Sequence, residues 1–420
     1  MRHLLLVILT LSILAIFPAE LLGQERKRTP ALREQVYSQL SRAQQLADGG
    51  DLKAGLAVLA TVESKLNSMN SYERAMLWNF YGFMHYSQDD IPAAISYFSK
   101  VVQEDPIPDA LLQGTLFSLA QLALGQERYQ DSLKYLDKWQ QAVGGEPQLK
   151  ALVLRAQVLY QLKQYDAALA PIVAAIESSQ KAGQRPDENW YVLARAIYFE
   201  LNQIDRVAEI LVQMIKHYNK AEYWVQLAGV YAQLGQDNKQ LAVLEAAHVQ
   251  GYLTKGHDIL NLAQAYFVND IPYKAARTLE QGIEQQKVEA NLRNLKLLAQ
   301  SWVAARETDK AVAALSKAAA LSDDGELDAQ RAQVLLNAER NTEAMAAAQQ
   351  ALDKAGLKQP GNMHLVIGMA ALNQGDFNTA LKAFASAKQF DDVRRTASQW
   401  ERYASAEKEQ AERIEALKQS

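Results

Sequence analysis

Apolar side chains follow a helical rhythm along most of this chain. From about residue 36 to residue 390 they recur at i, i+3 and i+4 in pairs of stripes, and a short polar stretch separates the two stripes of each pair. Such stripes predict amphipathic α-helices, because residues three and four apart lie on one face of a helix. The pattern therefore predicts an all-α domain built of consecutive helix pairs.

The helix pairs repeat with a period of 33 to 39 residues. One position in the first helix of each repeat is nearly always Ala or Gly, and we call it the small position. The residue sixteen positions later is apolar and lies in the second helix, and we call it the large position. Gly82 with Phe98 is one example, and Ala228 with Leu244 is another. Ten such repeats predict an α-solenoid superhelix, in which neighbouring pairs bury one continuous core. The small positions fall at residues 43, 82, 120, 156, 195, 228, 263, 299, 332 and 368.

The fifth repeat departs from this pattern. Arg195 occupies its small position, whereas Ala or Gly occupies the other nine. The register of this repeat is therefore either shifted by one residue or degenerate. The solenoid is expected over residues 36–390, after a flexible lead-in at 24–35. The charged segment 391–420 is expected to form a C-terminal helix that caps the last apolar face.

The first residues have the features of an export signal. Arg2 and His3 precede an apolar run at residues 4–17, which Pro18 ends. A short basic segment, an apolar run and a breaker are typical of secretory signal peptides, and the run is shorter than the roughly 20 residues that span a bilayer. We expect a signal peptide at residues 1–23 and a periplasmic protein without a membrane span in its mature chain. The alternatives are an inner-membrane anchor formed by residues 4–17 and a buried apolar helix.

Composition restricts the possible functions. The 420 residues carry 44 basic and 48 acidic side chains, a net charge of −4, which argues against a nucleic-acid-binding protein. Cysteine is absent, which excludes disulfides, thiol nucleophiles and cysteine-bound metals. The six histidines form no metal-binding pair, and the sequence has no phosphate-binding loop or nucleophile motif. We therefore expect no enzyme, with no catalytic residues, no metal, no cofactor and no small-molecule substrate.

Glutamine recurs directly after the small position in six of the ten repeats. In a superhelix of helix pairs, this residue points from the first helix into the concave face. Its amide can donate and accept hydrogen bonds, so a row of glutamines could bind the backbone of an extended peptide. The alternative is that glutamine is simply a solvated helix former here. The expected protein-binding residues, here called the groove glutamines, are Gln44, Gln121, Gln157, Gln264, Gln300 and Gln333.

The repeated positions resemble those of the tetratricopeptide repeat (TPR), a helix pair of about 34 residues. The resemblance implies a TPR-like α-solenoid of about ten helix pairs with a capping helix, and it implies binding of proteins or peptides. TPR domains that bind a C-terminal carboxylate carry Lys and Asn on this face, and pairs such as Lys296 with Gln300 do not reproduce that pattern. The fullest match lies in the second repeat, at Trp78, Tyr81, Gly82, Ala94, Phe98 and Pro106.

Several short strings resemble a narrower group, the exported TPR proteins that accompany TonB–ExbB–ExbD energy-transduction systems of Gram-negative bacteria. This resemblance implies a periplasmic partner of TonB-dependent uptake, with TonB, ExbB or ExbD as protein partners. The strings lie at residues 28–33, 69–73, 78–82, 115–120, 250–253 and 272–276.

Two functions remain open at this stage. One is a periplasmic scaffold that binds envelope proteins, with TonB-system components as the expected partners. The alternative is a general outer-membrane or cell-wall assembly factor of the same build. Both would act by binding an extended or helical segment in the groove, without chemistry.

Overall fold

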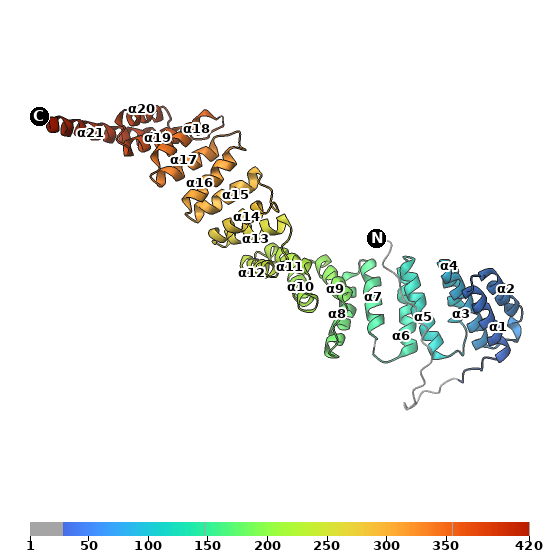
Figure 1. The fold of residues 1–420 in the computed structure, drawn as a ribbon. Coiled ribbons are helices and arrows are strands. Elements are labelled where there is room, and N and C mark those ends of the chain that lie inside the picture. Colours follow the sequence, from blue (N-terminus) through green and yellow to red (C-terminus); the bar gives the residue numbers. More distant parts are fainter. Residues whose placement is uncertain (1–27, 147, 355, 420) are drawn as a thin grey trace. The chain divides into compact units, whose positions relative to one another are not determined.

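The computed structural model describes residues 28–146, 148–354 and 356–419. The predicted signal peptide at residues 1–23 lies outside this part of the chain. Within it, all regular structure is helical: 21 α-helices and one short 3₁₀ helix, η1 (Figure 1). The all-α prediction is confirmed, and ten helix pairs followed by one long terminal helix match the expected TPR-like α-solenoid.

The chain divides into two compact units, and the division falls between residues 184 and 185. The sequence pattern runs through this point without a break. The first unit contains α1 (Glu34–Asp48), α2 (Leu52–Glu63), η1 (Leu66–Ser68), α3 (Ser71–Ser87), α4 (Ile91–Val101), α5 (Asp109–Gly125), α6 (Tyr129–Val143), α7 (Leu149–Gln161) and α8 (Tyr165–Lys181).

The second unit contains five helix pairs and the terminal helix. They are α9 (Glu188–Glu200), α10 (Ile204–Tyr218), α11 (Ala221–Gln233), α12 (Asp237–Val249), α13 (Gly256–Val268), α14 (Pro272–Glu284), α15 (Leu292–Ala304), α16 (Thr308–Ala319), α17 (Glu326–Asn337), α18 (Asn341–Asp353), α19 (Pro360–Asn373), α20 (Phe377–Ala387) and α21 (Arg394–Gln419). Helix α21 packs on α20, which is the second helix of the last pair.

The small and large positions form the contact inside each pair. A Cβ atom added to Gly82 would lie 2.6 Å from the ring of Phe98, and one added to Gly368 would lie 2.4 Å from the ring of Phe384. The rings therefore fill the space that the missing Cβ atoms leave. Where the small position is Ala, the large position is mostly Leu or Ile, as in the buried pair Ala228 and Leu244.

The turn inside each pair has one backbone conformation throughout. Seven residues after every small position the chain has a positive φ, and the amide of the next residue bonds back to the end of the first helix. The Asp90 amide, for example, donates to the His85 carbonyl at 3.0 Å. This is the hydrogen-bonding of a Schellman motif, which closes a helix with a left-handed residue. The left-handed residues are Gly50, Asp89, Glu127, Lys163, Asn202, Gly235, Asp270, Arg306, Glu339 and Gly375.

The fifth repeat is degenerate rather than shifted. Asn202 has the left-handed conformation seven residues after Arg195, and Leu211 is buried at the large position, so the register is that of the other repeats. Ala194 is fully buried, while Arg195 is half-buried and donates to the side chain of Gln226. Because an arginine cannot be buried against the second helix as an alanine can, α9 packs on α10 less extensively than its counterparts do in other pairs.

The first helix begins slightly earlier than expected. Helix α1 starts at Glu34, within the segment 24–35 that was assigned to a flexible lead-in. Directly before it, Arg33 forms an ion pair of 2.6 Å with Glu73, whose side chain is fully buried. The Ala31 carbonyl accepts a hydrogen bond of 2.9 Å from Asn70. These contacts attach the end of the lead-in to α3.

In the part of the chain that the structure describes, no helix has both the length and the apolar character to cross a bilayer.

Candidate functional site

The groove glutamines share one repeat position but not one environment. Gln157, Gln264, Gln300 and Gln333 are exposed, while Gln44 and Gln121 are half-buried. The Gln44 amide donates to Asp48 at 2.8 Å, and that of Gln333 donates to Asn337 at 2.9 Å. Both contacts run one turn along the same helix, as expected for solvated helix residues.

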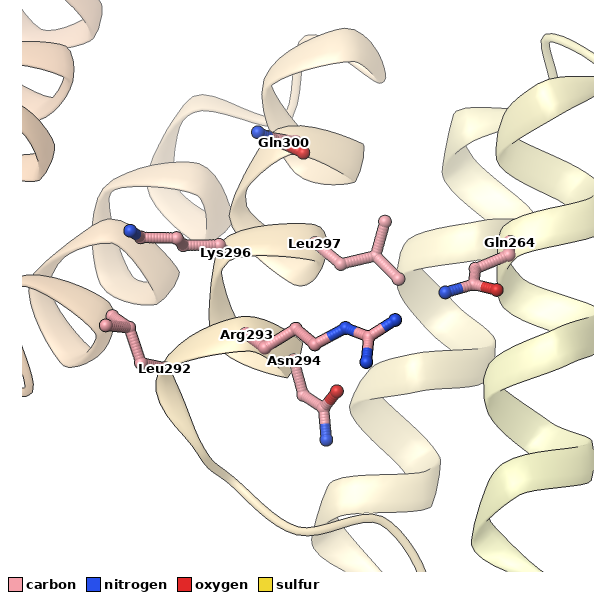
Figure 2. Close-up of a pocket in the computed structure, with 7 residues that line it drawn as sticks. All are labelled: Gln264, Leu292, Arg293, Asn294, Lys296, Leu297 and Gln300. Atoms are coloured by element: carbon pink, nitrogen blue, oxygen red, sulfur yellow. The ribbon is translucent and has the colours of Figure 1, made fainter.

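Gln264 and Gln300 are brought together by the fold. They lie on the successive first helices α13 and α15, and both line a groove with an accessible volume of about 530 Å³ (Figure 2). We call it the α13–α15 groove, and its lining is Gln264, Leu292, Arg293, Asn294, Lys296, Leu297 and Gln300. The other four groove glutamines do not line it.

The start of α15 is fixed by its own residues. The Asn291 side chain caps the helix by accepting a hydrogen bond of 3.0 Å from the Asn294 amide. The Asn294 side chain donates to the Glu289 carbonyl at 2.8 Å, so its amide nitrogen is already committed. Leu295, Leu298 and Trp302 are buried on the inner face of the helix. This anchoring sets the direction of the exposed face.

The exposed face of α15 carries Arg293, Lys296 and Gln300. Their spacing of i, i+3 and i+7 places their Cα atoms on one face of the helix. From this face the Arg293 side chain extends toward Gln264 on α13, whereas the Lys296 side chain extends away from α13 (Figure 2). Among the described residues, neither Arg293 nor Lys296 forms an ion pair, and no carboxylate lines the groove. The groove therefore combines two positive charges with the amides of Gln264 and Gln300.

A second groove lies where the last pair meets the terminal helix. Its accessible volume is about 650 Å³, and Leu372 of α19, Phe377 of α20, and Trp400 and Tyr403 of α21 line it together with Asn373, Gln399 and Glu407. Trp400 stacks on the buried Phe384 with ring centroids 6.2 Å apart. Its aromatic lining is therefore part of the contact between α21 and the solenoid.

The aromatic residues Tyr160, Phe199 and Phe267 lie one turn beyond the groove-glutamine position of their repeats, and they are divided between surface and core. Phe199 is 59% exposed at the end of α9. In contrast, Phe267 packs against the core cluster around Leu262 and Tyr266, and Tyr160 contacts Tyr165 of the second helix with ring centroids 5.5 Å apart. Packing thus explains two of them.

The pattern of glutamines alone missed Arg293, and it did not place Lys296 in a groove with Gln264. The sequence feature that could have identified them is the series of polar residues at i, i+3 and i+7 that ends at Gln300. That series becomes informative only when the partners of each cation are known.

The described residues also hold no cluster of three or more His, Asp or Glu side chains suited to a metal ion. The polar side chains of the α13–α15 groove are cations and amides, which bind by hydrogen bonding and charge.

A family model of the tetratricopeptide repeat matches residues 117–185 and 329–393. These two segments are similar to tetratricopeptide repeats. No curated protein sequence matches the chain.

Several solved structures are similar to this chain at low sequence identity. A tetratricopeptide repeat protein from Parabacteroides merdae ATCC 43184 is 13% identical, covering 63% of this chain and 99% of its own, with a TM-score of 0.36. YrrB, described as a TPR protein with an unusual peptide-binding site, is 16% identical over 46% of this chain and 97% of its own, with a TM-score of 0.36. MamA from Desulfovibrio magneticus RS-1 is 15% identical over 42% and 93%, with a TM-score of 0.34.

Proposed function

We propose that the chain is a protein-binding scaffold of the bacterial cell envelope, because each of its two compact units contains a segment similar to tetratricopeptide repeats. Repeats of this family bind protein or peptide segments and are generally not enzymes. The scaffold binds a segment of its partner along the exposed faces of its first helices, without chemistry.

One observation carries this proposal. Gln264 and Gln300 occupy the same position in successive repeats and line the same groove. Neither amide forms a hydrogen bond with another described residue, so both remain available to a ligand. A glutamine amide can donate to a backbone carbonyl and accept from a backbone N–H, which suits an extended segment that crosses the first helices.

The cellular setting is a separate part of the proposal. We propose that residues 1–23 direct export to the periplasm and that the partners are TonB, ExbB or ExbD. This part is supported by the sequence features of residues 1–23 and by the six short strings that resemble TPR proteins of TonB-dependent uptake. Four of those strings lie on helices, where they also contribute to the fold. They are residues 69–73 at the capped start of α3, 78–82 within α3, 115–120 in α5 and 272–276 in α14.

Blocking the α13–α15 groove with bulky side chains tests whether the partner binds there. The double variant Gln264→Trp, Gln300→Trp places two bulky side chains in the groove while leaving the buried face unchanged. The matched control is Gln281→Trp, an exposed glutamine on the second helix α14. Both tagged proteins are cross-linked in cells grown without iron, and recovered TonB, ExbB and ExbD are quantified by mass spectrometry.

We expect the control to recover these partners and the double variant to recover several-fold less, with equal helicity by circular dichroism. Equal recovery by the two variants would show that the groove is not the binding site. Absence of all three partners from the unmodified protein would remove the TonB assignment.

A general assembly factor of the outer membrane or cell wall is the second candidate, because the same groove would suit such partners. Deletion of the gene separates the two. A TonB-system partner predicts slower growth under iron limitation only, whereas an assembly factor predicts leakage of periplasmic proteins in any medium.

A further inference from the structure

We infer that the α13–α15 groove selects acidic side chains within an extended segment of its protein partner. This inference rests on the proposed protein-binding function and adds the chemistry of the bound segment. The ligand is a series of Asp or Glu side chains flanked by backbone, not a free C-terminal carboxylate.

The cations near the groove differ in whether a carboxylate pairs with them. Some cations of the same unit are paired, such as Lys274 with Glu245 at 2.9 Å, Arg331 with Asp328 at 3.0 Å, and Lys354 with Asp328 at 2.8 Å. Arg293 and Lys296 have no such partner among the described residues. Two unpaired positive charges in one groove attract an acidic ligand, and the attraction is strongest where part of the water is displaced.

The described lining of the groove carries no negative charge that could neutralise these cations, because no Asp or Glu is part of it. The carboxylate of Glu289, in the loop before α15, accepts a hydrogen bond of 3.0 Å from the Asn291 side chain and does not line the groove. The lining is therefore positive although the whole chain carries a net charge of −4.

The directions of the side chains suit an extended segment. In Figure 2 Arg293 extends from α15 toward α13 and Lys296 extends the other way, while Gln264 and Gln300 line the same groove. In an extended peptide, alternate side chains point the same way and are about 6.6 Å apart along the strand. A segment that crosses α15 can thus present one acidic side chain to each cation while the two glutamines bind its backbone.

The same features argue against a nucleic-acid ligand. Binding of single strands combines a longer track of positive charge with aromatic side chains on which bases stack. The lining of this groove contains two cations and no aromatic residue. An acidic protein segment needs only the charges and amides that are present.

The test uses the full chain and two fluorescent peptides of about twelve residues with amidated C-termini. In one, Glu and Asp alternate with Gly and Ser. In the other, Gln and Asn replace the acidic residues. Fluorescence anisotropy measures the affinity for each peptide, at salt concentrations between about 0.05 and 0.5 M because screening weakens exposed ion pairs.

We expect the acidic peptide to bind at least about tenfold more tightly than the neutral peptide at low salt, with the difference shrinking as salt rises. The double variant Arg293→Gln, Lys296→Gln should lose about tenfold in affinity for the acidic peptide. The control Lys287→Gln, Lys317→Gln removes the same charge from exposed sites outside the groove and should change the affinity less than twofold.

Three results would overturn the inference: equal binding of the two peptides, no binding of either, or equal losses in the two double variants. Competition by inorganic phosphate as effective as that by the acidic peptide would assign the groove to phosphate groups instead. The proposed function fails separately, when the Gln264→Trp, Gln300→Trp variant recovers its partners as well as its control does.

Discussion

Gly82 shows how a single residue sets the distance between two helices. Its missing Cβ leaves room for the ring of Phe98, which is buried and also packs edge-on against Phe83 with ring centroids 5.2 Å apart. Gly368 and Phe384 repeat the arrangement, whereas an alanine at the small position faces a smaller partner. The two positions are thus matched in combined volume, as close packing requires.

This matching gives the first prediction. Gly82→Ala should destabilise the second repeat by about 1–3 kcal/mol, because the added Cβ overlaps the Phe98 ring. In a Phe98→Leu background the same substitution should cost much less, since Ala with Leu is the pair found elsewhere in the solenoid. Urea unfolding of the four proteins of the cycle measures the coupling. Additive effects of the two substitutions would contradict the volume argument.

Glu73 is a buried carboxylate with a defined structural role. Its backbone amide donates to the Asn70 side chain and its own side chain accepts from the Asn70 amide, which forms a capping box at the start of α3. The Arg33 guanidinium, donating to the same carboxylate, lowers the pKa of Glu73 below its ordinary value, and the backbone amides of Asn70 and Arg33 act in the same direction against burial.

The second prediction concerns acid. Because the folded-state pKa of Glu73 is depressed, the stability it contributes is present above its ordinary pKa of about 4.3 and is lost as the pH falls through the folded-state value. Glu73→Gln should cost about 1–3 kcal/mol at pH 7, and the difference from the unmodified protein should shrink below pH 4. Thermal unfolding at a series of pH values measures this. The exposed Glu284→Gln is the control, with little effect at any pH.

At the scale of elements, two of the first helices, α13 and α17, have a glycine at their start that lies very close to the backbone of a neighbouring element. A Cβ added to Gly256, the first residue of α13, would lie 2.1 Å from the Lys287 carbonyl oxygen, which follows α14. One added to Gly325, directly before α17, would lie 2.2 Å from the Ala351 carbonyl oxygen on α18. In both cases the obstacle is backbone, which cannot move aside as a side chain can.

The third prediction contrasts two glycines on neighbouring first helices. Gly256→Ala should destabilise the protein by about 1–3 kcal/mol or more, because the α14 end must shift. Gly229→Ala, at an exposed site inside α11 with no atom near its Cβ, should stabilise it by about 0.5–1 kcal/mol through helix propensity. The shifts in thermal midpoint should therefore have opposite signs. Stabilisation by both substitutions would contradict the contact argument for Gly256, and destabilisation by both would contradict the propensity argument for Gly229.

For the whole molecule, the solenoid design makes stability local. Within each unit a helix pair contacts mainly the pairs before and after it, and the buried side chains form a series of separate clusters along the chain. In such an architecture the free energy of unfolding is approximately a sum over repeats and their interfaces. Damage to one repeat should consequently spread only to its neighbours.

The fourth prediction applies this to Ala228→Trp. A tryptophan at this buried small position overpacks α11 against Leu244 of α12 and should cost about 1–3 kcal/mol or more. Hydrogen exchange followed by mass spectrometry should show faster exchange in α11, α12 and the adjoining helices. Amides of α3 to α6, in the first unit, should keep the protection of the unmodified protein. Loss of protection along the whole chain would show that the array unfolds as one unit.

Much of this fold follows from sequence because its information is local. The period, the small and large positions and the polar turns placed ten helix pairs, and the left-handed residues fall seven residues after the same register marks. Even Arg195, which breaks the pattern, keeps that spacing. Two features were less accessible: the start of α1 at Glu34, which depends on the contact of Arg33 with Glu73, and the division between residues 184 and 185.

The candidate site was only partly accessible from sequence. The repeat register identified six equivalent glutamines, and a helix period cannot distinguish among them, because each has the same place on its own helix. Only the tertiary structure decided that Gln264 and Gln300 share a groove and that the amides of Gln44 and Gln333 bond within their own helices. It also decided that Arg293 and Lys296 form no ion pair with a described residue. Sequence by itself determined the helices, their pairing and the exposed faces, since those depend on residues close along the chain. Which exposed residues can meet a ligand depends on side chains from different repeats, whose contacts arise only when the helices pack.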